Sequence, residues 1–176
     1  MKNANPNNNP YPYGYTLPYL KRKKNYSRMQ NVSSLPQALR DYGPYPFALN
    51  ISDVTKQNDT FRTALWTGNH LQLTVMSIPP GEDIGLERHD NLDQFIRVES
   101  GRGMVMMGDT SDTPNFQQTV SDDYAFIIPA GKWHNVINLD NRPLKLYSIY
   151  TPVQHPFGTV HPTKQDAIDA EAEHHN

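Results

Sequence analysis

Short runs of apolar and aromatic residues, separated by polar turns, fill the chain from residue 47 to residue 150. Each run is rich in β-branched and aromatic residues and is bounded by Gly, Pro, Asn or Asp, so we expect each to form a strand. The runs are Phe47–Ser52, Phe61–Trp66, Leu71–Ile78, Ile84–His89, Leu92–Val98, Gly103–Met107, Tyr124–Ile128, Trp133–Leu139 and Leu144–Tyr150. Such close spacing predicts an all-β sandwich or barrel rather than alternating strands and helices.

Two short helices are expected beside the strands. Ser33 to Gly43 has a Ser cap, a proline in the first turn and a glycine stop. Near the C-terminus, Thr163 and Asp166 form a capping-box-like pair before Ala167–Ala172. No internal repeat is visible, so one barrel is expected. The predicted organisation is an arm over 1–31, a short helix and linker over 32–46, a barrel over 47–155, and an extension with a short helix over 156–176.

Charge is divided unevenly along the chain, although the total is only −2. Residues 1–40 contain seven basic and no acidic residues, whereas the remainder contains nine basic and eighteen acidic residues. The arm over 1–31 is rich in Asn, Pro and Tyr and includes the cluster Lys21–Lys24. This composition is typical of a solvated tail or an anchor to an acidic partner. Nucleic-acid binding is not expected, because the acidic barrel repels phosphate.

Composition excludes several classes of site. The 176 residues include no cysteine, which excludes disulfides, thiolate nucleophiles, iron–sulfur clusters and Cys-ligated zinc. The sequence contains no run of about 18 apolar residues, so no membrane span is expected. Met1–Pro6 lacks the apolar core of a secretory signal, so a cytoplasmic protein is expected.

Four polar side chains are placed to meet inside the barrel. Because side chains alternate along a strand, Glu87 and His89 project to one side. Gln94 shares a face of its strand with two apolar residues, and His134 shares a face with Asn138. Imidazole and carboxylate suit Fe, Mn, Zn, Ni or Cu, and an amide oxygen adds a weaker contact. We therefore predict one divalent transition metal per chain. The alternative is that these side chains only hydrogen-bond to one another.

Two segments carrying these residues resemble the two motifs of the cupin superfamily. The second motif is matched by Pro129-x-Gly131-x-x-His134-x-x-x-Asn138 and departs only at Asp123, where the family usually has Gly. The first motif is matched in spacing, from Gly81 through the pair Glu87-x-His89 and Gln94 to Gly101. It departs in chemistry, because the family's usual His-x-His pair begins here with Glu87, and its usual Glu is here Gln94. Two imidazoles and one carboxylate are nevertheless kept.

The resemblance covers about residues 70–152 and implies a single double-stranded β-helix, or jelly-roll, barrel with short flanking helices. It implies a metal held by Glu87, His89, Gln94 and His134, with catalytic residues undefined. Cupins include dioxygenases, sugar isomerases, epimerases, decarboxylases and non-enzymatic binding proteins. We therefore expect either a metal-dependent enzyme on a small molecule, oxygenase-like or isomerase-like, or a non-catalytic protein with a structural, sensing or coat-associated role. Small single-domain bacterial cupins are the most similar type.

Further residues are expected to have packing roles. His155 and His161 flank prolines in a loop, where they could cap the barrel mouth, although packing in the loop is favoured. Strand tyrosines such as Tyr150 could reach the cavity as acid/base groups, but such residues are usually in the core. Phe95 and Trp133 should face outward and give the barrel an apolar outer surface that needs a cover. A second subunit, as is common in cupins, or the Tyr/Pro-rich arm would provide it. We expect a homodimer.

Overall fold

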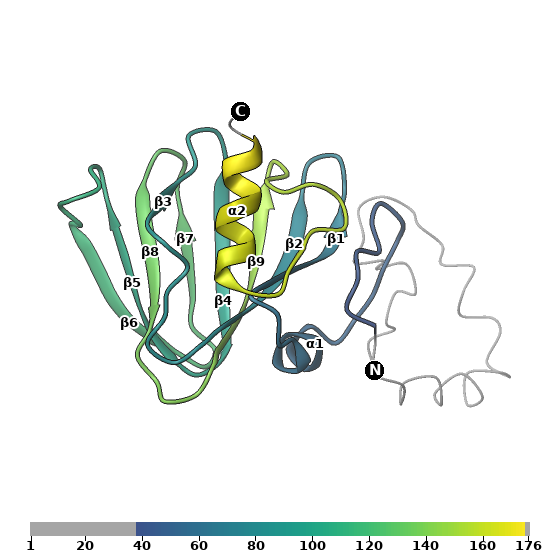
Figure 1. The fold of residues 1–176 in the computed structure, drawn as a ribbon, viewed down its shortest axis with the longest axis horizontal. Helices are drawn as coiled ribbons and strands as arrows, with labels where there is room; N and C mark the ends of the chain where they lie inside the picture. Colours follow the sequence, from purple (N-terminus) through teal and green to yellow (C-terminus); the bar gives the residue numbers. More distant parts are fainter. Residues whose placement is uncertain (1–37, 175–176) are drawn as a thin grey trace, which may run out of the picture. The chain divides into compact units, whose positions relative to one another are not determined.

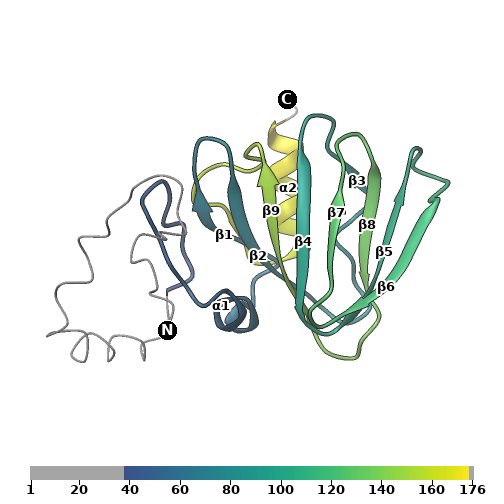
Figure 2. The same ribbon diagram turned by 180° about the vertical axis from the view of Figure 1, so that it is seen from behind.

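A computed structural model describes residues 38–174, which form two antiparallel sheets and two helices (Figures 1 and 2). The elements are α1 (Ile51–Gln57), β1 (Arg62–Thr67), β2 (Gln72–Ile78), β3 (Glu87–Arg88), β4 (Asp93–Ser100), β5 (Arg102–Gly108), β6 (Phe116–Ser121), β7 (Ala125–Ile128), β8 (Trp133–Asn138), β9 (Leu144–Thr151), β10 (Val160–His161) and α2 (Lys164–His174). One sheet has the order β10-β1-β2-β9-β4-β7 and the other β3-β8-β5-β6. The two sheets face each other, as expected for the predicted double-stranded β-helix, and the predicted fold class is confirmed.

The space between the sheets is divided into an apolar part and a polar part. Met76, Leu146 and Val98 are register partners on β2, β9 and β4, and all three are buried in the main apolar cluster. The row that lies four residues away, toward the start of β2 and the end of β9, is polar. That row consists of Gln72, Tyr150 and Gln94, each almost fully buried. Apolar packing therefore stabilises one part of the barrel, while the other is available for chemistry.

The prediction of a strand over Phe47–Ser52 is wrong. Residues 46–50 have no regular secondary structure, and α1 begins at Ile51. Asn50 caps this helix, because its side chain accepts a hydrogen bond from the Asp53 N–H at 3.3 Å. Val54 then buries its side chain in a second apolar cluster, against Leu65 of β1 and Val75 of β2. Capping and tertiary packing outweigh the β propensity of the segment.

Two strands were not predicted, and one is shorter than expected. β6 is an edge strand whose first four residues are exposed, so its sequence lacks an alternating apolar pattern. β10 has only two residues. Of the predicted strand Ile84–His89, only Glu87–Arg88 pairs as a named strand, with Trp133 and His134 of β8.

The N-terminal predictions fall largely outside the described residues. The arm over 1–31 lies outside them entirely, as do residues 33–37 of the predicted helix Ser33–Gly43. Residues 38–43 of that predicted helix are described and are not helical.

The predicted C-terminal helix is present as α2 and packs against the barrel. Thr163 and Asp166 form the predicted capping box, with the Thr163 N–H donating to Asp166 Oδ2 at 2.8 Å. Ala167 is buried in the main apolar cluster. Lys164 pairs with Asp83, whose backbone bridges to β8. Neither helix in the described part of the chain is long and apolar enough to cross a membrane.

Candidate metal centre

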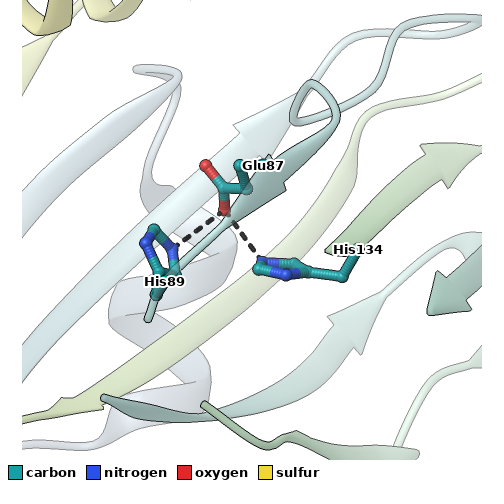
Figure 3. A group of neighbouring side chains, drawn as sticks. All are labelled: Glu87, His89 and His134. Carbon is teal, nitrogen blue, oxygen red and sulfur yellow. Dashed lines mark hydrogen bonds and ion pairs between the residues drawn. The ribbon is translucent and has the colours of Figure 1, made fainter. Parts of the chain in front are cut away.

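Three of the four predicted ligands converge between the sheets (Figure 3). Glu87 on β3 is the register partner of His134 on β8, and His89 follows directly after β3. Glu87 Oε1 lies 3.2 Å from His134 Nε2 and 3.4 Å from His89 Nε2. The ligand atoms of all three residues lie within 4.8 Å of one another. Glu87 thus stands between the two imidazoles, as the alternation along the strands predicts.

A tight turn before β8 helps to hold this geometry. Gly131 has φ +80°, a conformation that favours glycine. Its N–H donates to the carbonyl oxygen of His89 at 2.8 Å. The neighbouring Ala130 N–H donates to Asp93 Oδ1 at 3.0 Å. Gly131 therefore links the backbone of His89 to the turn that leads into β8, the strand of His134.

The spacing of the ligand atoms fits a small divalent ion. Ligands about 2.1 Å from a tetrahedral centre lie about 3.4 Å from one another. The two measured separations from Glu87 Oε1, 3.2 and 3.4 Å, match this value. The side chains of Glu87 and His89 are 17% and 11% exposed, and that of His134 is only 1% exposed. The ligand set is therefore largely shielded from water.

Hydrogen bonding fixes which nitrogen of His134 is available. Its Nδ1 lies 3.0 Å from the carbonyl oxygen of Lys132, and a carbonyl can only accept, so Nδ1 carries the proton. In the neutral ring, Nε2 is then an acceptor that faces the carboxylate of Glu87. His89 Nε2 has no hydrogen-bond partner in the described part of the chain. Two electron-pair donors, the Glu87 carboxylate and His134 Nε2, thus face each other beside His89 and require a cation or a proton between them.

Glu87 is ionised in this setting. Burial alone would raise its pKa, but the neighbouring imidazoles of His134 and His89 and the charge of Arg62 outweigh burial and hold the pKa well below its usual value. The group therefore offers a carboxylate and two imidazoles, a ligand set suited to Zn, Fe, Mn, Ni or Cu.

Gln94, the fourth predicted ligand, is buried on the polar row of β4. Its Nε2 donates to Ser148 Oγ at 3.2 Å. Its Oε1, the atom that would bind a metal, has no hydrogen-bond partner among the described residues. Ligation by Gln94 stays a prediction.

Other motif residues have structural roles. Asn138 Nδ2 donates to three carbonyl oxygens, those of Ile78, Pro79 and Arg142, and its Oδ1 accepts from the Asp140 N–H. Both ends of this amide therefore hold the neighbouring turns together. Asp123 has φ 71°, which explains why the family usually has glycine there and why a short polar side chain is tolerated.

Sequence reasoning missed a continuation of the site. The rings of His89, Tyr150, His155 and His161 follow one another, with successive centroid distances of 6.1, 5.2 and 6.4 Å. Arg62 on β1 is also buried, and its charge acts on Glu87 and Tyr150. His155 and His161 were expected to pack in their loop rather than to cap the barrel mouth. The flanking prolines gave no sign of an interior position, and nothing in the sequence distinguished Arg62 from an ordinary strand cation.

Comparison with known proteins points to one family. The family model described as Cupin domain matches residues 74–150. The uncharacterized protein YrkC of Bacillus subtilis (strain 168) is 65% identical over 133 residues, which cover 76% of this chain and 72% of that protein. The uncharacterized protein L612 of Acanthamoeba polyphaga mimivirus is 38% identical over 115 residues, covering 65% of this chain and 70% of that protein.

A solved structure extends the comparison to three dimensions. The crystal structure of BH2720 from Bacillus halodurans has a TM-score of 0.73 and 65% sequence identity with this chain. The similarity covers 74% of this chain and 98% of that one. The two-sheet architecture is thus shared along almost the whole of a related protein.

Proposed function

Since the chain belongs to the cupin superfamily, we propose that Glu87, His89 and His134 bind one divalent transition metal ion, beside which the barrel holds a small molecule. Gln94 is the proposed fourth ligand. The proposal rests mainly on one observation: an ionised carboxylate lies beside two imidazole nitrogens. One of these, His134 Nε2, is an acceptor because Nδ1 of the same ring donates to the carbonyl oxygen of Lys132. Leaving these groups without a cation is costly, because buried electron-pair donors repel one another.

The metal content of the reconstituted protein tests this proposal. Full-length protein purified without a metal-affinity tag, then incubated separately with Fe(II), Mn(II), Zn(II), Ni(II) and Cu(II) and desalted, is expected to retain about one equivalent of at least one ion. Thermal unfolding should shift upward with that ion, because it binds the folded state preferentially.

The hydrogen-bonded alternative makes the opposite prediction. If the three side chains only share protons, wild-type protein and a matched His70→Ala control, whose substituted side chain is exposed and lies outside the group, retain no more ion than a Glu87→Ala variant. Metal bound equally by wild-type protein and by a Glu87→Ala variant would also contradict the proposal.

The ligand count favours oxygenase chemistry over sugar isomerisation. Two His and one carboxylate are the ligands of non-haem iron oxygenases, which keep coordination positions open. Once bound, a divalent ion supplies Lewis-acid or dioxygen chemistry at those positions. The residues of this chain position it: Glu87 offers charge, and Lys132 fixes the tautomer of His134. A non-catalytic sensing role would use the same ligands.

We further propose that the chain forms a homodimer through the outer face of β4, β7 and β9. Phe95, Ile127 and Ile149 are register partners there, and Ile127 is 62% exposed. The ring of Tyr147 lies beside that of Phe95. Exposed apolar patches of this kind mark association surfaces.

Sedimentation of full-length protein tests the dimer. Wild-type protein is expected to sediment as a dimer, and Ile127→Glu should shift it toward the monomer, because the charge would be buried without a partner. The matched control is Ile168→Glu, which changes an exposed isoleucine on α2 instead. A wild-type monomer, or an Ile127→Glu protein that stays dimeric, would contradict this interface.

A further inference from the structure

A buried arginine lies on the interior face of the barrel, outside the metal ligands. Arg62 is 2% exposed, and its register partners are Met76 on β2 and His161 on β10. Because Met76 packs in the main apolar cluster, the Arg62 side chain points between the sheets. A guanidinium is always charged, so β1 places a permanent cation in the interior.

The hydrogen-bonding capacity of this cation is only partly used. Nη1 lies 3.7 Å from Glu171 Oε1 on α2, too far for a hydrogen bond. Within the described residues, neither Nε nor Nη1 has a hydrogen-bond partner. The side chain of Glu171 is 54% exposed, so the carboxylate facing Arg62 comes from the surface of the protein. An exposed partner at this distance can be replaced by a better one.

Two imidazoles beside Arg62 also have unused polar atoms. His155 Nε2 and His161 Nδ1 are buried without hydrogen-bond partners in the described part of the chain. Burial and the nearby charge of Arg62 lower the pKa of His155 to about 3, so this ring is neutral at pH 7. The Tyr150 ring lies between His155 and the metal ligand His89. The unused donors therefore adjoin the candidate metal centre.

We propose that Arg62, with His155 and His161, binds the carboxylate of a small monocarboxylic acid, which replaces Glu171 as the partner of the guanidinium. The planar fork of a guanidinium matches a carboxylate through two parallel hydrogen bonds. A neutral sugar brings no charge to a buried cation. A single carboxylate is enough to pair with the one charge of this guanidinium. This assignment rests on the proposed function only in taking the acid as the molecule held beside the metal.

Calorimetric titration with a matched pair of probes tests the proposal. Lactate and its neutral amide, lactamide, differ essentially in charge. Full-length protein is expected to bind lactate at least about tenfold more tightly than lactamide, because the charge-assisted hydrogen bonds are lost with the amide. Glu171→Gln should tighten lactate binding by about threefold, since it removes the competing carboxylate. Glu173→Gln is the matched control, with the same loss of charge on the same helix, and should leave lactate binding unchanged.

Arg62→Met completes the test and should weaken lactate binding by about tenfold or more, and lactamide binding by less, because only the lactate bonds are charge-assisted. If that variant does not fold, the difference between Glu171→Gln, which should tighten lactate binding, and Glu173→Gln, which should leave it unchanged, still decides. Equal binding of lactate and lactamide by wild-type protein, no lactate binding at all, or equal effects of the two helix variants would overturn the proposal. Repeating the titration on His134→Ala separates the two claims. Charge-selective binding there without metal supports the Arg62 site even if the metal proposal fails.

Discussion

Replacing His134 with alanine is expected to abolish metal binding while leaving the fold in place. The side chain provides one of three ligand atoms and is the most buried of the three. Because loss of an outer-shell partner alone costs 10–100-fold in metal affinity, loss of a direct ligand should weaken binding by more than about 100-fold. Competition of the reconstituted protein with a coloured chelator measures this affinity.

A second variant and a control make the result specific. His89→Ala should lose metal similarly, although His89 lies outside the named strands. His70→Ala, at an exposed position, should keep wild-type affinity. Far-UV circular dichroism should show the same strand content in all three proteins. Wild-type affinity in either ligand variant would mean that the ion binds elsewhere.

Replacing Leu146 with alanine is expected to lower the free energy of unfolding by about 3 kcal/mol, within the range for fully buried leucines. Leu146 has no exposed surface and lies on the central strand β9, between Met76 and Val98. Its removal leaves a cavity in the apolar part of the barrel. Urea denaturation followed by tryptophan fluorescence measures the loss.

The same substitution at Leu71 is the control. Leu71 is 39% exposed and precedes β2, so Leu71→Ala should cost less than about 0.5 kcal/mol. Metal content per folded chain should be unchanged in Leu146→Ala, because the leucine belongs to the apolar part of the interior. Equal costs for the two variants would show that the apolar row does not carry the stability of the barrel.

Much of the fold was predictable, because strands covered on one face carry a period-two pattern. β8 shows this pattern clearly, with His134, Val136 and Asn138 buried and the residues between them half-buried. The failures occur where that pattern is weak. The first four residues of β6 are exposed at a sheet edge, so no alternation marks them. Residues 47–52 have strand-like composition, but the Asn50 cap and the packing of Val54 favour a helix.

The candidate site was predictable to the extent that it depends on alternation along neighbouring strands. Glu87 and His89 are two residues apart and project to the same side, and Glu87 pairs with His134 on the neighbouring strand, so the three side chains meet. Arg62 was not predicted to belong to the interior, and a place for His155 at the barrel mouth was not the favoured prediction. Interior positions of this kind depend on pairing between distant segments, such as β1 with β10. No local pattern distinguishes an inward strand cation from an outward one like Arg97, which pairs with Asp123 at 2.6 Å on the outer face.

X-ray absorption at the edge of the bound metal tests the central claim most directly. Reconstituted wild-type protein should show two imidazole nitrogens and at least one carboxylate oxygen about 2.0 to 2.2 Å from the ion. Glu87→Ala and His134→Ala should each lose the corresponding ligand or the ion itself. A first shell made only of water or carboxylate oxygens, without imidazole, would contradict a metal centre built from Glu87, His89 and His134.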